Sequence, residues 1–143
     1  MSQIYESPYV RLYVEDGILY GIYKEGVHIT LEVARTIVRE RVAMQGSRVM
    51  PGMIFLQEIG SVDPDARAYL GTPEASKNIN ALALVTHSPF MNIISNMYIY
   101  FNRPPVPVKL FSKEQDGLKW LQQFKGKGDN NAGNTKAERL YAF

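Results

Sequence analysis

The chain has 143 residues, of which 45% are hydrophobic, 16 are basic and 14 are acidic. This length and composition are typical of one globular domain with a single core. The formal net charge of only +2 argues against a nucleic-acid-binding surface, and the absence of cysteine excludes disulfides, a thiol nucleophile and thiolate metal ligands.

Targeting and metal-binding signals are also missing from the sequence. The first ten residues, MSQIYESPYV, have neither the basic segment nor the apolar segment of a signal peptide. No apolar run approaches the ~18 residues of a membrane-spanning helix. His28 and His87 lie far apart and do not form an HExxH motif. We therefore expect a cytoplasmic protein with no integral membrane segment, no metal site and no cofactor.

An antiparallel hairpin is predicted near the N-terminus. Residues 9–14 (YVRLYV) and 18–25 (ILYGIYKE) are rich in strand-forming residues, and the Asp16-Gly17 pair between them is typical of a hairpin turn. Residues on both faces of the second run are largely apolar. We therefore expect that strand to be covered on both sides.

A helix is predicted to follow over residues 31–45. Thr30 is a suitable N-cap and Gly46 a suitable C-terminal residue. One face of this helix carries residues at helical spacing, namely Leu31, Ala34, Ile37, Val38, Arg41 and Val42. This pattern indicates a surface helix that lies on a sheet.

The rest of the chain alternates between short apolar runs and helix-start signals. The apolar runs of strand length are residues 53–58, 81–87 and 106–111, and Pro107 favours an edge position for the last of them. The helix-start signals are Asp63-Pro64, Thr72-Pro73, Ser88-Pro89 and the capping box of Ser112 with Gln115.

The resulting order, β-β-α-β-α-β-α-β-α, predicts an α/β fold. We expect a mixed, mostly parallel sheet of about five strands, with an N-terminal antiparallel hairpin and helices on the faces. This domain is predicted to span residues 1–125. Residues 126–143 begin with GKGDNNAGNT, which indicates a flexible or docking C-terminal tail.

The last third of this pattern resembles the STAS-like proteins, which are related to the anti-sigma factor antagonists and to the CRAL-TRIO lipid-binding fold. The carrying stretch is ALALVT followed by a helix and by RPPVPVKLFSKEQDGLKWL. Pro107, Phe111, Trp120 and Leu121 match the group's closing pattern, with Gly117 in place of the usual alanine. The resemblance covers about residues 9–124. It implies a non-enzymatic regulatory domain that acts on protein partners.

Ser61 is the residue that the resemblance points to as a phosphosite. The better-known antagonists carry a phosphorylatable serine in an Asp-Ser-Ser-Gly turn after the third strand. This chain has EIGSVD, residues 58–63, at that place, so Ser61 lies in the right neighbourhood but the motif is absent.

A ligand site is predicted at the carboxyl edge of the sheet, where ligands of open α/β sheets bind. Glu58, Ser61, Asp63, His87 and Ser88 follow two predicted strands and should lie at that edge. Helix N-termini also point there and favour anions such as a carboxylate or a phosphate.

His87-Ser88 admits two interpretations. A catalytic interpretation makes Ser88 a nucleophile, His87 its base and Asp63 the orienting acid. However, the G-x-S-x-G elbow that usually presents such a serine is absent. A serine before a proline is explained more simply as an N-cap. We therefore expect no catalytic residue here.

The helix that starts at Pro89 carries the remaining candidates. Asn92, Ser95 and Asn96 form a predicted solvated or binding face. Beyond them, a predicted exposed patch for a dimer contact consists of Tyr98, Tyr100 and Phe101.

Three functional hypotheses follow. We favour a non-enzymatic STAS-like domain that acts through a protein partner or as a homodimer. The alternative is a carrier of a small apolar or lipid-like ligand, in line with the CRAL-TRIO relationship. An unidentified enzyme is the third.

Overall fold

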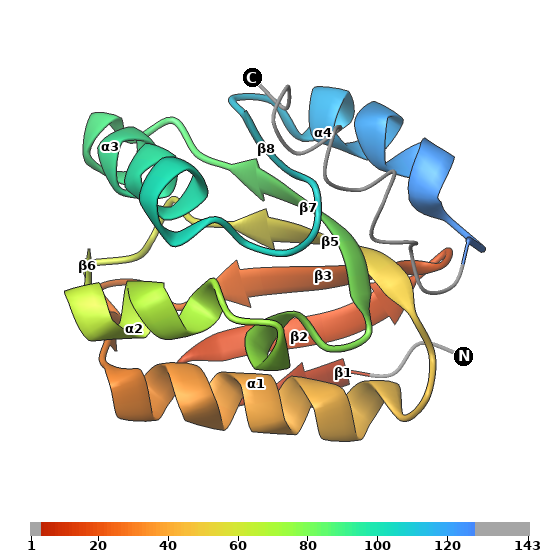
Figure 1. Cartoon of the computed structure of the whole chain (residues 1–143), viewed down its shortest axis with the longest axis horizontal. Helices are drawn as coiled ribbons and strands as arrows, with labels where there is room; N and C mark the ends of the chain where they lie inside the picture. Colours follow the sequence, from red (N-terminus) through yellow and green to blue (C-terminus); the bar gives the residue numbers. More distant parts are fainter. Residues whose placement is uncertain (1–3, 128–143) are drawn as a thin grey trace.

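A six-stranded sheet in the order β1-β2-β3-β5-β7-β8 forms the middle layer of this computed structural model, which describes residues 4–127 (Figure 1). Its strands are β1 (Ile4–Glu6), β2 (Val10–Glu15), β3 (Ile18–Tyr23), β5 (Met50–Phe55), β7 (Ile79–Val85) and β8 (Val108–Phe111). β1, β2 and β3 pair antiparallel, whereas β3, β5, β7 and β8 are parallel neighbours. The predicted mixed, mostly parallel sheet with an N-terminal hairpin is confirmed. β1 adds a sixth strand that was not expected.

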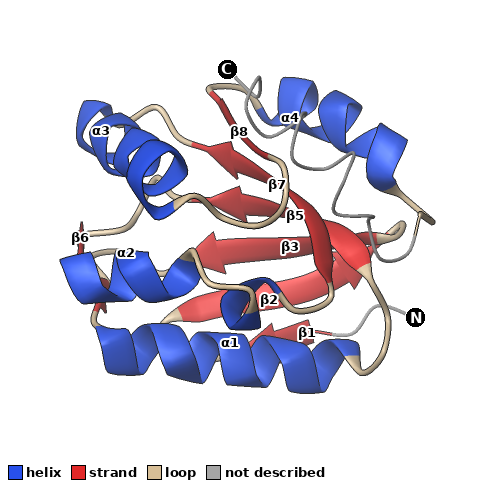
Figure 2. Ribbon diagram, viewed as in Figure 1, coloured by secondary structure: helices blue, strands red, loops and turns tan. Residues whose placement is uncertain are grey.

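Helices cover both faces of this sheet (Figures 1 and 2). The helices α1 (Leu31–Gln45), α2 (Pro64–Leu70) and α3 (Pro89–Met97) share one face, and α4 (Glu114–Leu121) packs on the other. The remaining short elements are β4 (His28–Ile29), β6 (Ser61–Val62), the π-helical turn η2 (Tyr98–Asn102) and the 3₁₀ turns η1 (Glu74–Ser76) and η3 (Gln122–Phe124). β4 and β6 form a separate two-stranded parallel pair.

Three hydrophobic clusters hold these layers together, two on the face of α1, α2 and α3 and one on the face of α4. Leu19 and Leu84 lie in a cluster beneath α1, α2 and α3. Ile18, Met53 and Ala83 lie in the cluster beneath α4. Neighbouring residues of one strand thus lie in clusters on opposite faces of the sheet, because successive side chains of a strand point to opposite faces. The central strands are buried on both sides, as predicted.

Several element boundaries differ from the prediction. β5 begins at Met50, three residues before the predicted strand, because Pro51 and Gly52 lie buried inside it at a register irregularity instead of in a loop. β7 likewise begins at Ile79 and ends at Val85, two residues earlier at each end than predicted. Proline and glycine can occupy a strand where a bulge removes the need for regular pairing.

Helix caps are confirmed in part. The Thr30 hydroxyl accepts a hydrogen bond from the Val33 N–H at 3.1 Å, as an N-cap does. The predicted capping box of Ser112 and Gln115 is wrong. α4 begins only at Glu114, with Lys113 in the cap position and no side-chain cap. Thr72-Pro73 leads only to the short turn η1, because the chain enters β7 a few residues later.

The C-terminal tail lies outside the described residues from residue 128 onward. The boundary at residue 125 therefore stays a prediction.

β8 is an edge strand, as Pro107 indicated.

Close packing of α4 on the sheet depends on Gly117. A Cβ atom at this position would lie 3.3 Å from Ala83, Met53 and Phe111 side-chain atoms. Ala83 is itself small and fully buried on the facing strand. Because Gly117 has no side chain and Ala83 has only a methyl group, α4 can approach the sheet closely.

We predict that Gly117→Leu lowers the free energy of unfolding by about 1–3 kcal/mol, because the new side chain has no space against the sheet. The matched control is Asp116→Leu, which places the same side chain at the neighbouring exposed position and should change stability by less than about 0.5 kcal/mol. Urea denaturation followed by circular dichroism measures both. Equal effects would contradict this account of the interface.

Candidate functional site

The residues predicted at the carboxyl edge of the sheet fall into two groups. β3, β5 and β7 all end at this edge, which is on the left in Figure 1. The first group surrounds the β4–β6 pair, where His28 lies opposite Ser61. The His28 Nε2 atom lies 2.7 Å from the Asp63 Oδ1 atom. Both side chains are substantially exposed, so this pair contributes little to stability.

Asp63 therefore uses its carboxylate differently from the prediction. It occupies the N-cap position of α2, with Pro64 as the first helical residue, but makes no side-chain cap hydrogen bond. Its carboxylate contacts His28 instead. Glu58 lies nearby in the chain, with an exposed side chain and a backbone carbonyl that accepts a hydrogen bond from the Gly26 N–H at 2.7 Å.

The second group lies where β7 leads into α3. The His87 side chain is exposed, and its backbone N–H donates to the Gln57 Oε1 atom at 2.7 Å. The Ser88 hydroxyl accepts a hydrogen bond from the Met91 N–H at 3.2 Å, which is the predicted N-cap. A cleft of about 320 Å³ lies beside this group, with Phe55, Gln57, His87 and Lys113 in its wall.

The two groups do not assemble into one reacting centre. Within residues 4–127, no hydrogen bond or ion pair joins Ser61 or Asp63 to His87 or Ser88. The described part of the chain also has no cluster of three or more His, Asp or Glu side chains that could hold a metal ion. The edge thus offers separate polar positions for a ligand, and the role of its residues in binding stays a prediction.

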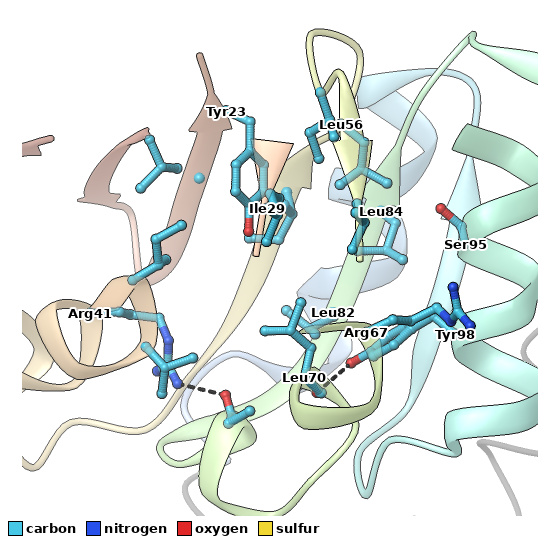
Figure 3. A pocket seen from close by; sticks show the side chains of 18 of the residues that line it. Tyr23, Ile29, Arg41, Leu56, Arg67, Leu70, Leu82, Leu84, Ser95 and Tyr98 are labelled. Carbon is cyan, nitrogen blue, oxygen red and sulfur yellow. Dashed lines mark hydrogen bonds between the residues drawn. The ribbon is translucent and has the colours of Figure 1, made fainter. Parts of the chain in front are cut away.

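A different site, not predicted from the sequence, lies between the sheet and the three helices on its first face. An apolar pocket of about 140 Å³ lies between β2, β3, β5 and β7 on one side and α1, α2 and α3 on the other (Figure 3). Its walls are aliphatic except for a few polar side chains, which are Tyr23, Arg41, Arg67, Ser76, Ser95 and Tyr98. The sequence holds no local motif for this pocket, because its residues come from eleven separate elements.

Arg41 is the most buried charge in this pocket wall, with 6% of its surface exposed. Its guanidinium donates to the backbone oxygens of Lys77 at 2.8 Å and Ala75 at 2.9 Å, and also to the Gln45 side chain. Burial lowers the pKa of Arg41 to about 10, so the group stays charged at neutral pH. These bonds tie α1 to the segment that precedes β7.

Two phenols share the pocket with Arg41. The Tyr98 hydroxyl donates to the Leu70 carbonyl at 3.1 Å (Figure 3). Burial raises the pKa of both phenols, that of Tyr23 to about 12, and the nearby Arg41 charge opposes the rise for Tyr23. Both hydroxyls therefore stay protonated at neutral pH and can donate hydrogen bonds.

The orientation of α3 differs from the prediction. Ser95, predicted on a solvated or binding face together with Asn92 and Asn96, is buried against the pocket, whereas both asparagines are exposed. Tyr98 was assigned to an exposed patch, but it also faces the pocket. The reason is that large apolar residues lie on both sides of this segment, with Met91 and Ile94 at the pocket and Ile93 and Phe101 facing outward, so periodicity alone did not separate its two faces.

The outward side of α3 and η2 carries exposed apolar residues. Phe90 is 49% exposed, Ile93 62%, Tyr100 57% and Phe101 77%. We call these four residues the apolar face of α3. The predicted exposure is thus confirmed at Tyr100 and Phe101 and wrong at Tyr98, and the dimer contact stays a prediction. Within the described part of the chain, no helix is long and apolar enough to cross a membrane.

We predict that Ser88→Ala lowers the free energy of unfolding by about 1 kcal/mol, because the Met91 N–H loses its acceptor. Ser88→Asp keeps an acceptor at the helix start and should retain wild-type stability. Thermal and urea denaturation measure the three proteins. Unchanged stability of the alanine variant would contradict the capping role and reopen other roles for the hydroxyl.

Comparisons with known proteins give a fold and a family for this architecture. A solved structure from Shewanella loihica PV-4, an uncharacterised protein of the DUF3478 family with a SpoIIAA-like fold, is similar to this chain with a TM-score of 0.53 and 16% sequence identity. The similarity covers 85% of this chain and 92% of that one, so the STAS-like fold that the sequence indicated is confirmed. No curated protein sequence matches the chain. Residues 12–125 match the model of a family described as Domain of unknown function (DUF7793), and the chain is a member of that family.

Proposed function

We propose that this chain is a non-enzymatic regulatory domain of STAS-like fold that acts in the cytoplasm through a protein contact, and that the apolar face of α3 makes this contact. The SpoIIAA-like fold supports a regulatory role in general terms. The specific support is the set of large apolar side chains that α3 and η2 present to solvent. A contiguous exposed apolar surface commonly marks an interaction site.

The arrangement of the apolar face favours one continuous contact. Phe90 and Ile93 are three residues apart, and Tyr100 follows Ile93 by seven, which are spacings that place side chains on one side of a helix. Aromatic residues are also enriched at the centres of protein interfaces. The four side chains therefore form a stripe along one helix instead of scattered exposed residues.

A second copy of the chain is the partner that this stripe fits best. Residues 89–102 contain no acidic or basic side chain. Two such helices can pair about a twofold axis, with each stripe covering the other, and no like charges meet. The proposed assembly is a homodimer with α3 at its centre.

We predict that the double variant Ile93→Lys/Phe101→Lys is monomeric at protein concentrations where the wild type is dimeric. Four lysines would meet across the twofold axis, two from each copy, and like charges at an interface oppose association. Light scattering coupled to size exclusion measures the mass of each protein. We expect the variant dissociation constant to rise at least ~100-fold.

The matched control is Asn92→Lys/Asn96→Lys, which adds the same charge to exposed polar positions of the same helix. It should leave the dimer intact to within about threefold. A wild type that stays monomeric up to about 0.5 mM would contradict the homodimer. In that case, the wild-type chain and the Ile93→Lys/Phe101→Lys variant would each be immobilised. A different protein that binds the wild type but not the variant would then assign the apolar face of α3 to a heterologous partner.

Regulation by phosphorylation at Ser61 is a finer part of the proposal. Ser61 is half-buried in β6, opposite His28 and two residues before Asp63. A phosphate there would add close to two negative charges beside the Asp63 carboxylate and would compete for His28. Each charge would be duplicated in a twofold dimer.

We predict that Ser61→Asp changes the dissociation constant of the dimer at least threefold, because the new carboxylate lies close to Asp63 and competes with it for His28 in each copy. Ser61→Ala, which removes the hydroxyl without adding charge, should associate like the wild type. Analytical ultracentrifugation gives both dissociation constants. Identical values for the two variants would remove Ser61 from the proposal.

The carrier hypothesis has one observation in its favour, the apolar pocket beneath α3. Its volume of about 140 Å³ lies below the roughly 300–1,000 Å³ of pockets that hold drug-sized molecules. A long lipid chain does not fit this volume. If the chain is a carrier, its ligand is therefore a small molecule and not a lipid.

A further inference from the structure

The pocket beneath α3 has the size and the walls for a small apolar body. A buried apolar cavity of about 150 Å³ stays dry and takes up a molecule the size of benzene. The pocket has about 140 Å³, and side chains such as Ile54, Leu82 and Leu84 form its sheet side. An apolar body of about six carbon atoms would fill it.

A buried positive charge without an acidic partner stands in the wall of this pocket. The acceptors of the Arg41 guanidinium are two backbone carbonyls and one amide oxygen, all of them uncharged. None of the carboxylates in residues 4–127 lies within 4.0 Å of it. A buried charge is costly unless it is paired, and the lowered pKa of Arg41 reflects that cost.

Hydrogen-bond donors also remain for a ligand. The three bonds of Arg41 engage Nη1 and Nη2, so its Nε–H has no partner among residues 4–127. Tyr23, whose hydroxyl stays protonated, lines the same pocket. A guanidinium and a phenol in the wall of one pocket can donate hydrogen bonds to the two oxygens of a carboxylate.

We propose that this pocket binds a small monocarboxylic acid, with its carboxylate held by Arg41 and Tyr23 and its apolar body against Leu82 and Leu84. The site does not depend on the proposed dimer, because its residues come from one copy and face inward. It also differs from the predicted anion site at the carboxyl edge of the sheet. A purely structural role of Arg41 would explain its bonds to the Ala75 and Lys77 carbonyls, but not the apolar space beside it.

The test uses benzoate and benzamide, which have the same ring and nearly the same shape but differ in charge. The full chain, labelled with ¹⁵N and with ¹³C at its methyl groups, is titrated with each probe in NMR experiments. We expect benzoate to bind with a dissociation constant below about 1 mM and to shift the methyl signals of Leu82 and Leu84. Benzamide should bind at least about tenfold more weakly, because hydrogen bonds between charged groups are the stronger ones.

Three variants assign the contacts. Arg41→Lys keeps the charge but loses the planar fork, and should weaken benzoate about tenfold while leaving benzamide unchanged. Arg39→Lys, at an exposed position of the same helix, is the matched control and should have no effect. Ser95→Leu adds bulk inside the pocket and should abolish the binding of both probes. Dispersion of the amide spectrum verifies that each variant folds, and Ser95→Val replaces the leucine variant if it does not.

Several results would overturn the proposal. These are the absence of saturable shifts in the folded wild type, equal affinity for both probes, or unchanged binding in the Ser95 variant. A loss of benzoate binding in Arg67→Lys but not in Arg41→Lys would move the carboxylate to the other guanidinium of the wall and refute the assignment. Light scattering on the same samples reports the dimer separately, so failure of one proposal is distinguishable from failure of the other.

Discussion

Burial of β5 and β7 on both faces is the constraint on which the rest of the structure depends. A parallel strand covered on both sides needs apolar residues at nearly every position and a helical layer above and below. The helices α1, α2 and α3 supply one layer and α4 supplies the other. Because α4 is the single helix on its face in residues 4–127, it must approach closely, and Gly117 above Ala83 makes this approach possible. The opposite face, covered by α1, α2 and α3, keeps the apolar pocket of about 140 Å³.

Most of the fold could be predicted from the sequence because its signals are local. Alternating apolar runs, the Asp16-Gly17 turn and the Thr30 cap each depend on a few adjacent residues, and the structure confirms them. The errors arise where tertiary structure overrides a local sequence signal. Pro51 and Gly52 normally mark a loop, yet here they lie inside β5 at an irregularity in the ladder. The edge strand β1 has only three residues, too few for a periodic pattern.

The candidate sites were less predictable because they depend on side-chain placement between distant elements. The carboxyl edge followed from topology, and Ser61, Asp63, His87 and Ser88 do follow the strands that end there, but no sequence rule separates them into two groups. The pocket was not predicted at all. In the sequence, Arg41 is one more residue of an amphipathic helix. Only the structure shows that its side chain is buried beside an apolar pocket with no acidic partner among the described residues. Ser95 shows the same limit, since a small polar residue suits a solvated face and a pocket wall equally well.

α3 combines two surfaces with opposite demands, and this restricts which substitutions evolution can accept along it. A charged residue at Met91 or Ser95 would penalise folding, whereas one at Ile93 or Phe101 would leave folding intact and impair association. Within the middle of α3, only Asn92 and Asn96 are constrained neither by folding nor by association. The sequences of related chains should therefore vary most freely at the positions of Asn92 and Asn96. A related chain that no longer self-associates should carry acidic or basic residues on the outer side of α3 alone.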